Sequence, residues 1–160
     1  MNFTTFTRIA QPSALRLLVA LAAAGVACSS AGGAGSPQPA NPEATVIEFL
    51  SAIRDQDMGA MEQLWGSSSG LTSDRLDAQT LQQRLTVMRI YLAHEEYTII
   101  PRPNDMFVDT QSGEQVVYVR LTRKGCTPVV PFTVAPYRGG WLVRNIDLQA
   151  AGNPERRCQP

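Results

Sequence analysis

The residue types with the most reactive side chains are scarce in this sequence: one histidine, His94, and three cysteines, Cys28, Cys126 and Cys158. A single histidine with no thiol or carboxylate three or four residues away does not form a metal site. No Gly-x-Ser-x-Gly turn presents a serine nucleophile to it. His94 stands near the end of an expected helix, where the helix dipole alone favours histidine. The sequence therefore predicts no metal site, no cofactor and no catalytic histidine.

Cys28 follows a segment with the features of an export signal. Residues 1–16 contain two arginines and no acidic residue, and an uninterrupted apolar run of eleven residues follows from Leu17 to Ala27. Eleven residues are too few to cross a hydrocarbon core, which takes about 20. A basic start, a short apolar run and small residues at its end are typical of a secretory signal peptide. We expect residues 1–27 to be removed on export.

The end of this segment resembles the lipobox of bacterial lipoproteins, in which small or aliphatic residues precede a cysteine that receives a diacylglyceryl group and becomes the N-terminus. Val26, Ala27 and Cys28 match this pattern, whereas Gly25 stands where the family usually has leucine or another aliphatic residue. The resemblance implies that acyl chains on Cys28 anchor the protein to a membrane. An ordinary signal peptidase acting at Ala22-Ala23-Ala24 is the alternative.

The same resemblance predicts a location in the bacterial cell envelope. Ser29 replaces the aspartate that holds lipoproteins in the inner membrane of many diderm bacteria, which favours the outer membrane, facing the periplasm. Cysteines pair in such an oxidising compartment. With Cys28 acylated, Cys126 and Cys158 remain as one pair, and we expect a disulfide that attaches the polar tail 151–160 to the turn around Cys126. Two free thiols are the alternative.

Composition separates a tether from a folded domain. After Cys28, residues up to 42 are Gly, Ser, Ala, Pro, Gln and Asn without charge, a flexible linker composition. The whole chain has 14 basic and 14 acidic residues, so that loss of Arg8 and Arg16 with the signal leaves 12 against 14 and a net charge of −2. This balance argues against a nucleic-acid partner. The overall apolar fraction of 44% predicts a globular domain.

Three helices are expected at the start of that domain. Asn41 and Pro42 begin the first helix, whose apolar face consists of Val46, Phe49, Leu50 and Ile53. Asp57 caps a second, short helix that the flexible segment 66–70 ends, with Met58, Met61, Leu64 and Trp65 on one face. A third helix starts near Asp77, with an apolar face of Leu81, Leu85, Met88 and Leu92. Its solvent-facing side carries Gln82, Gln83, Arg84 and Arg89.

After Glu96 the apolar pattern changes from helical to alternating. It predicts a short strand at 97–100, a hairpin of 106–108 and 115–123 around a turn at 111–113, and strands at 127–135 and 141–148. Pro131 predicts an edge position or a bulge in the third of these segments. Helices first and strands afterwards predict an α+β domain, with three N-terminal helices packed on one face of an antiparallel sheet.

This order of elements resembles the nuclear transport factor 2-like superfamily, a cone of three helices and a curved antiparallel sheet. The superfamily includes ketosteroid isomerase-like and polyketide cyclase-like proteins. Residues 43–57 resemble its opening helix, and Gly139-Gly140-Trp141-Leu142-Val143 resembles its closing strand. The resemblance places the domain at residues 43–150 and implies a cone with space for a ligand.

Enzymes of this superfamily place an acid or base and a phenol around an apolar cavity. The resemblance makes Trp65, Tyr91, Tyr97 and Asp147 candidates to line such a pocket, and it transfers no catalytic residue. We expect a lipid-anchored envelope protein whose domain binds a partner protein or a small molecule without catalysis. The alternative is a small cone-fold enzyme. A large cavity that contains a carboxyl group would favour the enzyme, and a filled cone would favour the binding protein.

Overall fold

The computed structural model describes residues 38–154 except 107, 112 and 124, and all of these belong to one compact unit. The expected signal, tether, Cys28 and Cys158 lie outside the described residues, so their predicted roles stay predictions. None of the helices within the described part is long and apolar enough to cross a membrane.

The first helix, α1 (Pro42–Asp55), begins and buries its apolar face as the sequence predicts. The Asn41 side chain accepts a hydrogen bond from the Ala44 N–H at 2.8 Å, which satisfies one of the free donors of the first turn. The helix ends at Gln56, whose φ of 58° is left-handed. Four residues of one face have no more than 3% exposure: Val46, Phe49, Leu50 and Ile53.

The helices α2 (Met58–Leu64) and α3 (Ala78–Tyr91) are also capped by the predicted aspartates. Asp57 accepts the Ala60 N–H at 2.9 Å, and Asp77 accepts the Thr80 N–H at the same distance. The hydrogen bond from the Thr80 backbone holds the pKa of Asp77 below its ordinary value. The stabilisation by this cap is therefore present above the unfolded-state pKa and is lost as the pH falls through the folded-state value.

The connection between α2 and α3 differs from the flexible segment predicted at 66–70. It forms a small antiparallel ribbon of β1 (Gly66–Ser67) and β2 (Gly70–Leu71), followed by a 3-10 turn, η1 (Thr72–Asp74). The Ser67 and Ser69 hydroxyls lie 2.9 Å apart, and the Ser69 N–H donates to the Ser67 hydroxyl. Serine side chains that satisfy one another and the backbone order a segment that composition alone describes as flexible.

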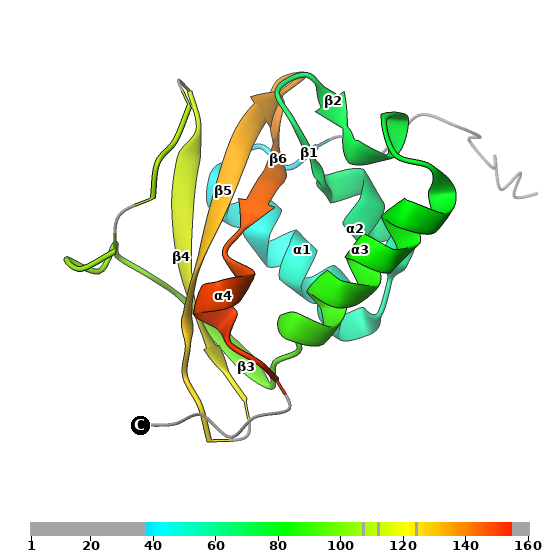
Figure 1. Ribbon diagram of the computed structural model, residues 1–160. Coiled ribbons are helices and arrows are strands. Elements are labelled where there is room, and N and C mark those ends of the chain that lie inside the picture. Colours follow the sequence, from blue (N-terminus) through cyan, green and yellow to red (C-terminus); the bar gives the residue numbers. More distant parts are fainter. Residues whose placement is uncertain (1–37, 107, 112, 124, 155–160) are drawn as a thin grey trace, which may run out of the picture. The chain divides into compact units, whose positions relative to one another are not determined.

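The sheet contains β3 (Glu96–Ile100), β4 (Gln115–Thr122), β5 (Val129–Tyr137) and β6 (Gly140–Ile146), all antiparallel in the order β3-β4-β5-β6. The last strand ends at Ile146, two residues before the predicted end, because Asp147 caps a short helix, α4 (Leu148–Ala151), through the Ala150 N–H. The three N-terminal helices cover one face of the sheet (Figure 1). The α+β class is confirmed.

Two strand predictions are wrong in detail. The segment 106–108 forms no strand at its described residues, Met106 and Val108, because β3 and β5 already occupy the two edges of β4. Pro131 lies in a central strand rather than an edge strand, and the bulge falls later, between Thr133 and Val134. The Pro131 carbonyl accepts the Asp147 N–H at 3.1 Å, so Pro131 lies opposite the end of β6. Because β6 ends there, the absence of an N–H on proline removes no hydrogen bond between the two strands.

The inner face of the sheet and the three helices form one apolar core. Its fully buried members include Phe49 and Met61 from the helices and Phe132, Leu121 and Val130 from the sheet. The sheet is not strongly curled. The structure therefore has the predicted layers but does not have the pronounced curvature of a cone, and side chains fill the region between helices and sheet.

We expect the Gly66→Ala substitution to destabilise the domain by about 2 kcal/mol, because an added methyl group would overpack this site. A Cβ at Gly66 would lie 2.5 Å from the Gly70 carbonyl oxygen and 2.8 Å from a Leu142 methyl group. Gly59→Ala, in the exposed part of α2, is the matched control, since its Cβ approaches only an Asp57 oxygen at 3.4 Å. Urea denaturation of both variants measures the difference, and equal stabilities would contradict the close contact.

Candidate functional site

Trp65 lies where α2 meets the free edge of the sheet. It forms a parallel bridge with Val143 of β6, and its side chain is 7% exposed. Among the described residues, β6 is the last strand in the order of the sheet, so its outer edge pairs with no further strand of that sheet. The space between that edge and α3 is therefore bordered by a helix, a strand and an indole ring.

A cavity of about 470 Å³ occupies this space, and we call it the α3–β6 groove. This volume lies in the usual range for small-molecule sites. Five apolar side chains, from the end of α2, from α3, from β6 and from α4, form most of its lining: Trp65, Val87, Met88, Ile146 and Leu148. Val87 is 45% exposed, so part of the apolar lining is in contact with water.

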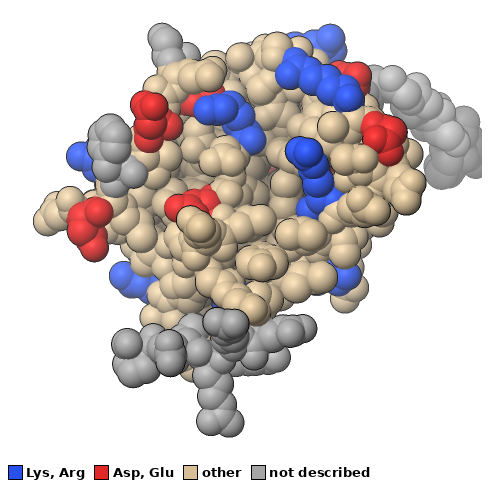
Figure 2. All heavy atoms as spheres, in the orientation of Figure 1, with Lys and Arg blue, Asp and Glu red and all other residues tan. Residues whose placement is uncertain are grey.

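A second cavity of about 430 Å³ continues the groove along α3. The two cavities share Val87 and Leu148, and the second one also contains Tyr91. Figure 2 shows this face of the molecule: most of the surface around α4 is uncharged, an acidic side chain lies at its upper border, and basic side chains lie further above it in the view. The two cavities thus form one elongated apolar depression between α3 and the α4 end of the sheet.

The charges in the α3–β6 groove are basic. Arg84 from α3 and Arg144 from β6 line it together with the amides of Gln83 and Asn145, and none of the described residues that line these two cavities is acidic. Within the described part of the chain, Arg84 forms no hydrogen bond or ion pair. A guanidinium without a partner beside an apolar surface can bind an anion.

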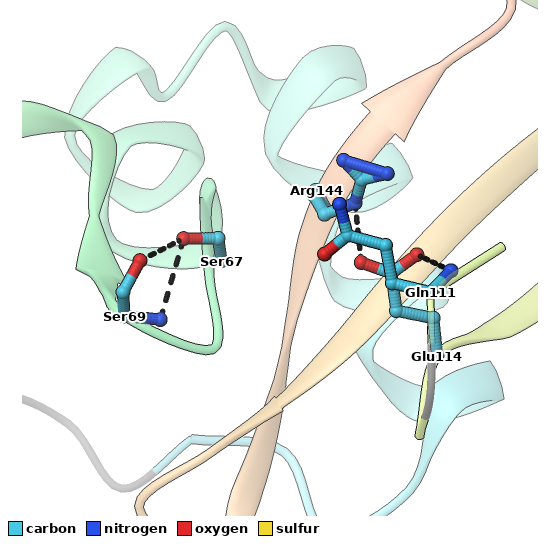
Figure 3. Close-up of polar contacts among 5 residues, drawn as sticks. All are labelled: Ser67, Ser69, Gln111, Glu114 and Arg144. Carbon is cyan, nitrogen blue, oxygen red and sulfur yellow. Dashed lines mark hydrogen bonds and ion pairs between the residues drawn. The ribbon is translucent and has the colours of Figure 1, made fainter.

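Arg144 has a protein partner. Its Nε forms an ion pair with Glu114, a carboxylate from the start of β4 whose side chain is 4% exposed. The other Glu114 oxygen accepts the Gln111 N–H at 2.8 Å, so one carboxylate oxygen has an ion pair and the other a hydrogen bond (Figure 3). β5 lies between the two strands that carry this pair. Arg144 therefore neutralises Glu114, and Arg84 supplies the uncompensated positive charge in the groove.

The four predicted pocket residues lie in different places. Trp65 lines the α3–β6 groove and Tyr91 lines its continuation. Asp147 caps α4 and lines a neighbouring cavity of about 440 Å³, which shares Asn145, Ile146 and Leu148 with the α3–β6 groove. Tyr97 packs against the apolar core and meets the His94 ring edge-to-face at 5.6 Å. The structure places Trp65 and Tyr91 along one depression, Asp147 at the border of that depression, and Tyr97 elsewhere.

A cavity of about 650 Å³ lies between the start of α1 and the 101–118 segment. Its lining carries both signs of charge, with Glu43 and Glu114 against Arg102. The same segment contains Phe107 and Ser112, which lie outside the described residues. This cavity therefore gives a weaker basis for a ligand site than the α3–β6 groove.

Arg123 is a buried arginine with a structural role. It is 8% exposed, and its guanidinium donates hydrogen bonds to the carbonyls of Tyr91, Ala151 and Gly152. Burial lowers the pKa of Arg123, although arginine stays charged at neutral pH. Its backbone forms a bridge with Cys126, at 2.8 and 3.0 Å. Arg123 thus holds the C-terminal segment against the turn that contains Cys126.

Sequence reasoning assigned Arg84 to the solvent-facing side of α3 and did not consider it as a site residue. The helical spacing could have grouped Arg84 with the groove. Its residues on α3 are spaced at i, i+3, i+4 and i+7 and share a helix face: Arg84, Val87, Met88 and Tyr91. The roles of Glu114 and Arg144 had no such signal, since the two residues are 30 positions apart.

Among the described residues, no group of three or more His, Cys, Asp and Glu side chains is placed to hold a metal ion. The fold and groove define the chain as an α+β protein with an apolar, basic surface depression. Comparisons with protein-family models, curated proteins and solved structures found no match.

Proposed function

We propose that this protein is a lipid-anchored envelope protein whose α+β domain binds a small ligand without catalysing a reaction. The observation that carries the binding role is the contrast between a filled interior and an open groove. Buried apolar side chains of the described residues pack between the sheet and the helices, whereas the α3–β6 groove is open, apolar and basic. The same order of helices and strands supports our proposal that the domain is nuclear transport factor 2-like.

The anchoring role is supported by the sequence before the domain and by the way the domain begins. Trp141 donates its backbone N–H to the Pro39 carbonyl at 3.1 Å, and the Gln38 amide donates to the Gln63 carbonyl at 3.2 Å. These contacts attach the first described residues beside the β5–β6 turn. Cys28 and Gln38 are ten residue steps apart, and a linker of this composition would span roughly 17 Å. A lipid on Cys28 would thus keep this end of the domain close to the membrane.

Cys28→Ser is expected to move the protein from the membrane fraction to the soluble fraction, because the anchoring acyl chains are lost. The measurement is cell fractionation, together with the intact mass of the wild-type protein from membranes. The wild-type mass should correspond to a chain that starts at Cys28 and carries acyl groups. Ser29→Ala, which keeps the lipobox, is the control. An unmodified wild-type chain that starts at Gly25 and is found in the soluble fraction would contradict lipidation.

A thermal-shift screen of small molecules on residues 34–160 tests the binding role. We expect at least one compound to raise the melting temperature of the wild type. The same compound should not raise the melting temperature of Val87→Asp, in which a carboxylate blocks the α3–β6 groove. Turnover of any such compound would instead support the cone-fold enzyme.

A further inference from the structure

The lining of the α3–β6 groove combines an apolar surface with a positively charged side chain. Trp65, Met88 and Leu148 contribute apolar area, and Arg84 contributes a positive charge that no described residue neutralises. An apolar ligand body would remove the exposed Val87 from water. An anionic group on the same ligand would pair with Arg84. Neither a neutral hydrocarbon nor a simple inorganic anion would use both features.

The dimensions restrict the ligand further. Arg84 and Tyr91 lie seven residues apart on α3, which corresponds to roughly 10 Å along the helix axis. The apolar depression extends over this distance from the arginine to the tyrosine. A ligand with its anionic group at Arg84 therefore has space for an extended apolar chain of about eight to ten carbons along α3.

We infer that the α3–β6 groove binds a small amphipathic carboxylate, with its carboxylate at Arg84 and its apolar body along Val87, Leu148 and Tyr91. This inference depends on the proposed ligand-binding function and names its ligand class. The groove lies outside the filled interior between the sheet and the helices, so the ligand does not compete with core side chains. Because Arg144 already pairs with Glu114, the carboxylate of the ligand pairs with Arg84.

Trp65 provides a direct test, because the protein has two tryptophans and Trp141→Phe leaves Trp65 as the sole emitter. The probes are decanoate, decanol and decyltrimethylammonium, added to residues 34–160 of this variant. We expect decanoate to change the Trp65 emission saturably, decanol to bind about tenfold more weakly and the cation not to bind. Vesicles of anionic lipid should leave the emission unchanged, since the ligand is a free amphiphile.

Variants assign the binding to the groove. Arg84→Gln should weaken decanoate about fivefold and leave decanol unchanged, because only the ion pair is lost. Arg54→Gln, on α1 and 56% exposed, is the matched control and should change neither affinity. Val87→Asp should abolish decanoate binding, since it places a carboxylate in the groove. The exposure of Val87 makes this change compatible with folding, and circular dichroism verifies it.

Equal affinities of the wild type for decanoate and decanol, or an Arg84→Gln variant with unchanged affinity for decanoate, would overturn the carboxylate assignment. Binding of the cation or of vesicles alone would overturn it as well. In each of these cases a ligand found by the thermal-shift screen would leave the proposed binding function intact. Failure of all probes and of the screen would instead overturn the binding function itself, while the mass of the membrane-bound protein tests anchoring separately.

Discussion

The Arg123→Met variant is expected to lose about 3 kcal/mol of unfolding free energy. The loss follows from three carbonyl groups that accept hydrogen bonds from this one guanidinium, since a hydrogen bond to a charged group contributes about 1.5–3 kcal/mol. The removal of a desolvated charge offsets part of this sum, which is why the expected loss is smaller than three such bonds. Methionine keeps much of the side-chain volume, so that the change measures lost hydrogen bonding rather than an empty space.

Arg120 is the matched control for this experiment. It lies on β4 three residues before Arg123 and is exposed, so Arg120→Met should change the unfolding free energy by no more than about 0.5 kcal/mol. Urea denaturation of residues 34–160 under oxidising conditions gives both values. If the two variants are equally stable, the hydrogen bonds of Arg123 do not hold the C-terminal segment.

The second large effect is expected at the proposed Cys126–Cys158 disulfide. Cys158→Ser should destabilise the oxidised protein by about 3.7 kcal/mol, the chain-entropy value for a closed loop of about 33 residues. The structure describes the surroundings of Cys126 but not those of Cys158. Arg123 bridges to Cys126 and donates to the Gly152 carbonyl, and the six residue steps from Gly152 to Cys158 can span up to about 20 Å.

Cys126→Ser and the double variant complete this test. If one bond joins the two cysteines, both single variants and the double variant should have the same stability in oxidant. A reducing agent should then remove most of the difference from the wild type. A peptide map without reduction identifies the bonded pair directly. Two free thiols titrated in the oxidised segment 34–160, which lacks Cys28, would refute the disulfide.

Local chemistry explains why the helices were predictable. Asn41, Asp57 and Asp77 cap their helices through N–H groups three residues away, and each cap was readable from residue type and spacing. The same holds for the alternating strands, since Val117, Val119 and Leu121 face the core as their period of two requires. Interactions over three or four residues leave a direct trace in the sequence.

Other features had no such trace. Pro131 in a central strand is tolerated because β6 ends at Ile146, and the expected 106–108 strand is missing from the described residues because β3 pairs with β4. Which strand pairs with which depends on the whole chain. The sheet is also not strongly curled, which the order of elements did not indicate.

The sequence by itself determined the α+β class, the helix starts and the apolar faces, because each depends on neighbours within one or two turns. The predictions of export and lipidation rest on residues before the domain and come from the sequence alone. Only the tertiary structure decided that Trp65 and Arg84 line one groove and that Glu114 pairs with Arg144. These residues come from separate elements. Their proximity depends on how strands and helices pack. That packing is determined by the close fit of all core side chains and not by the residues of any one segment.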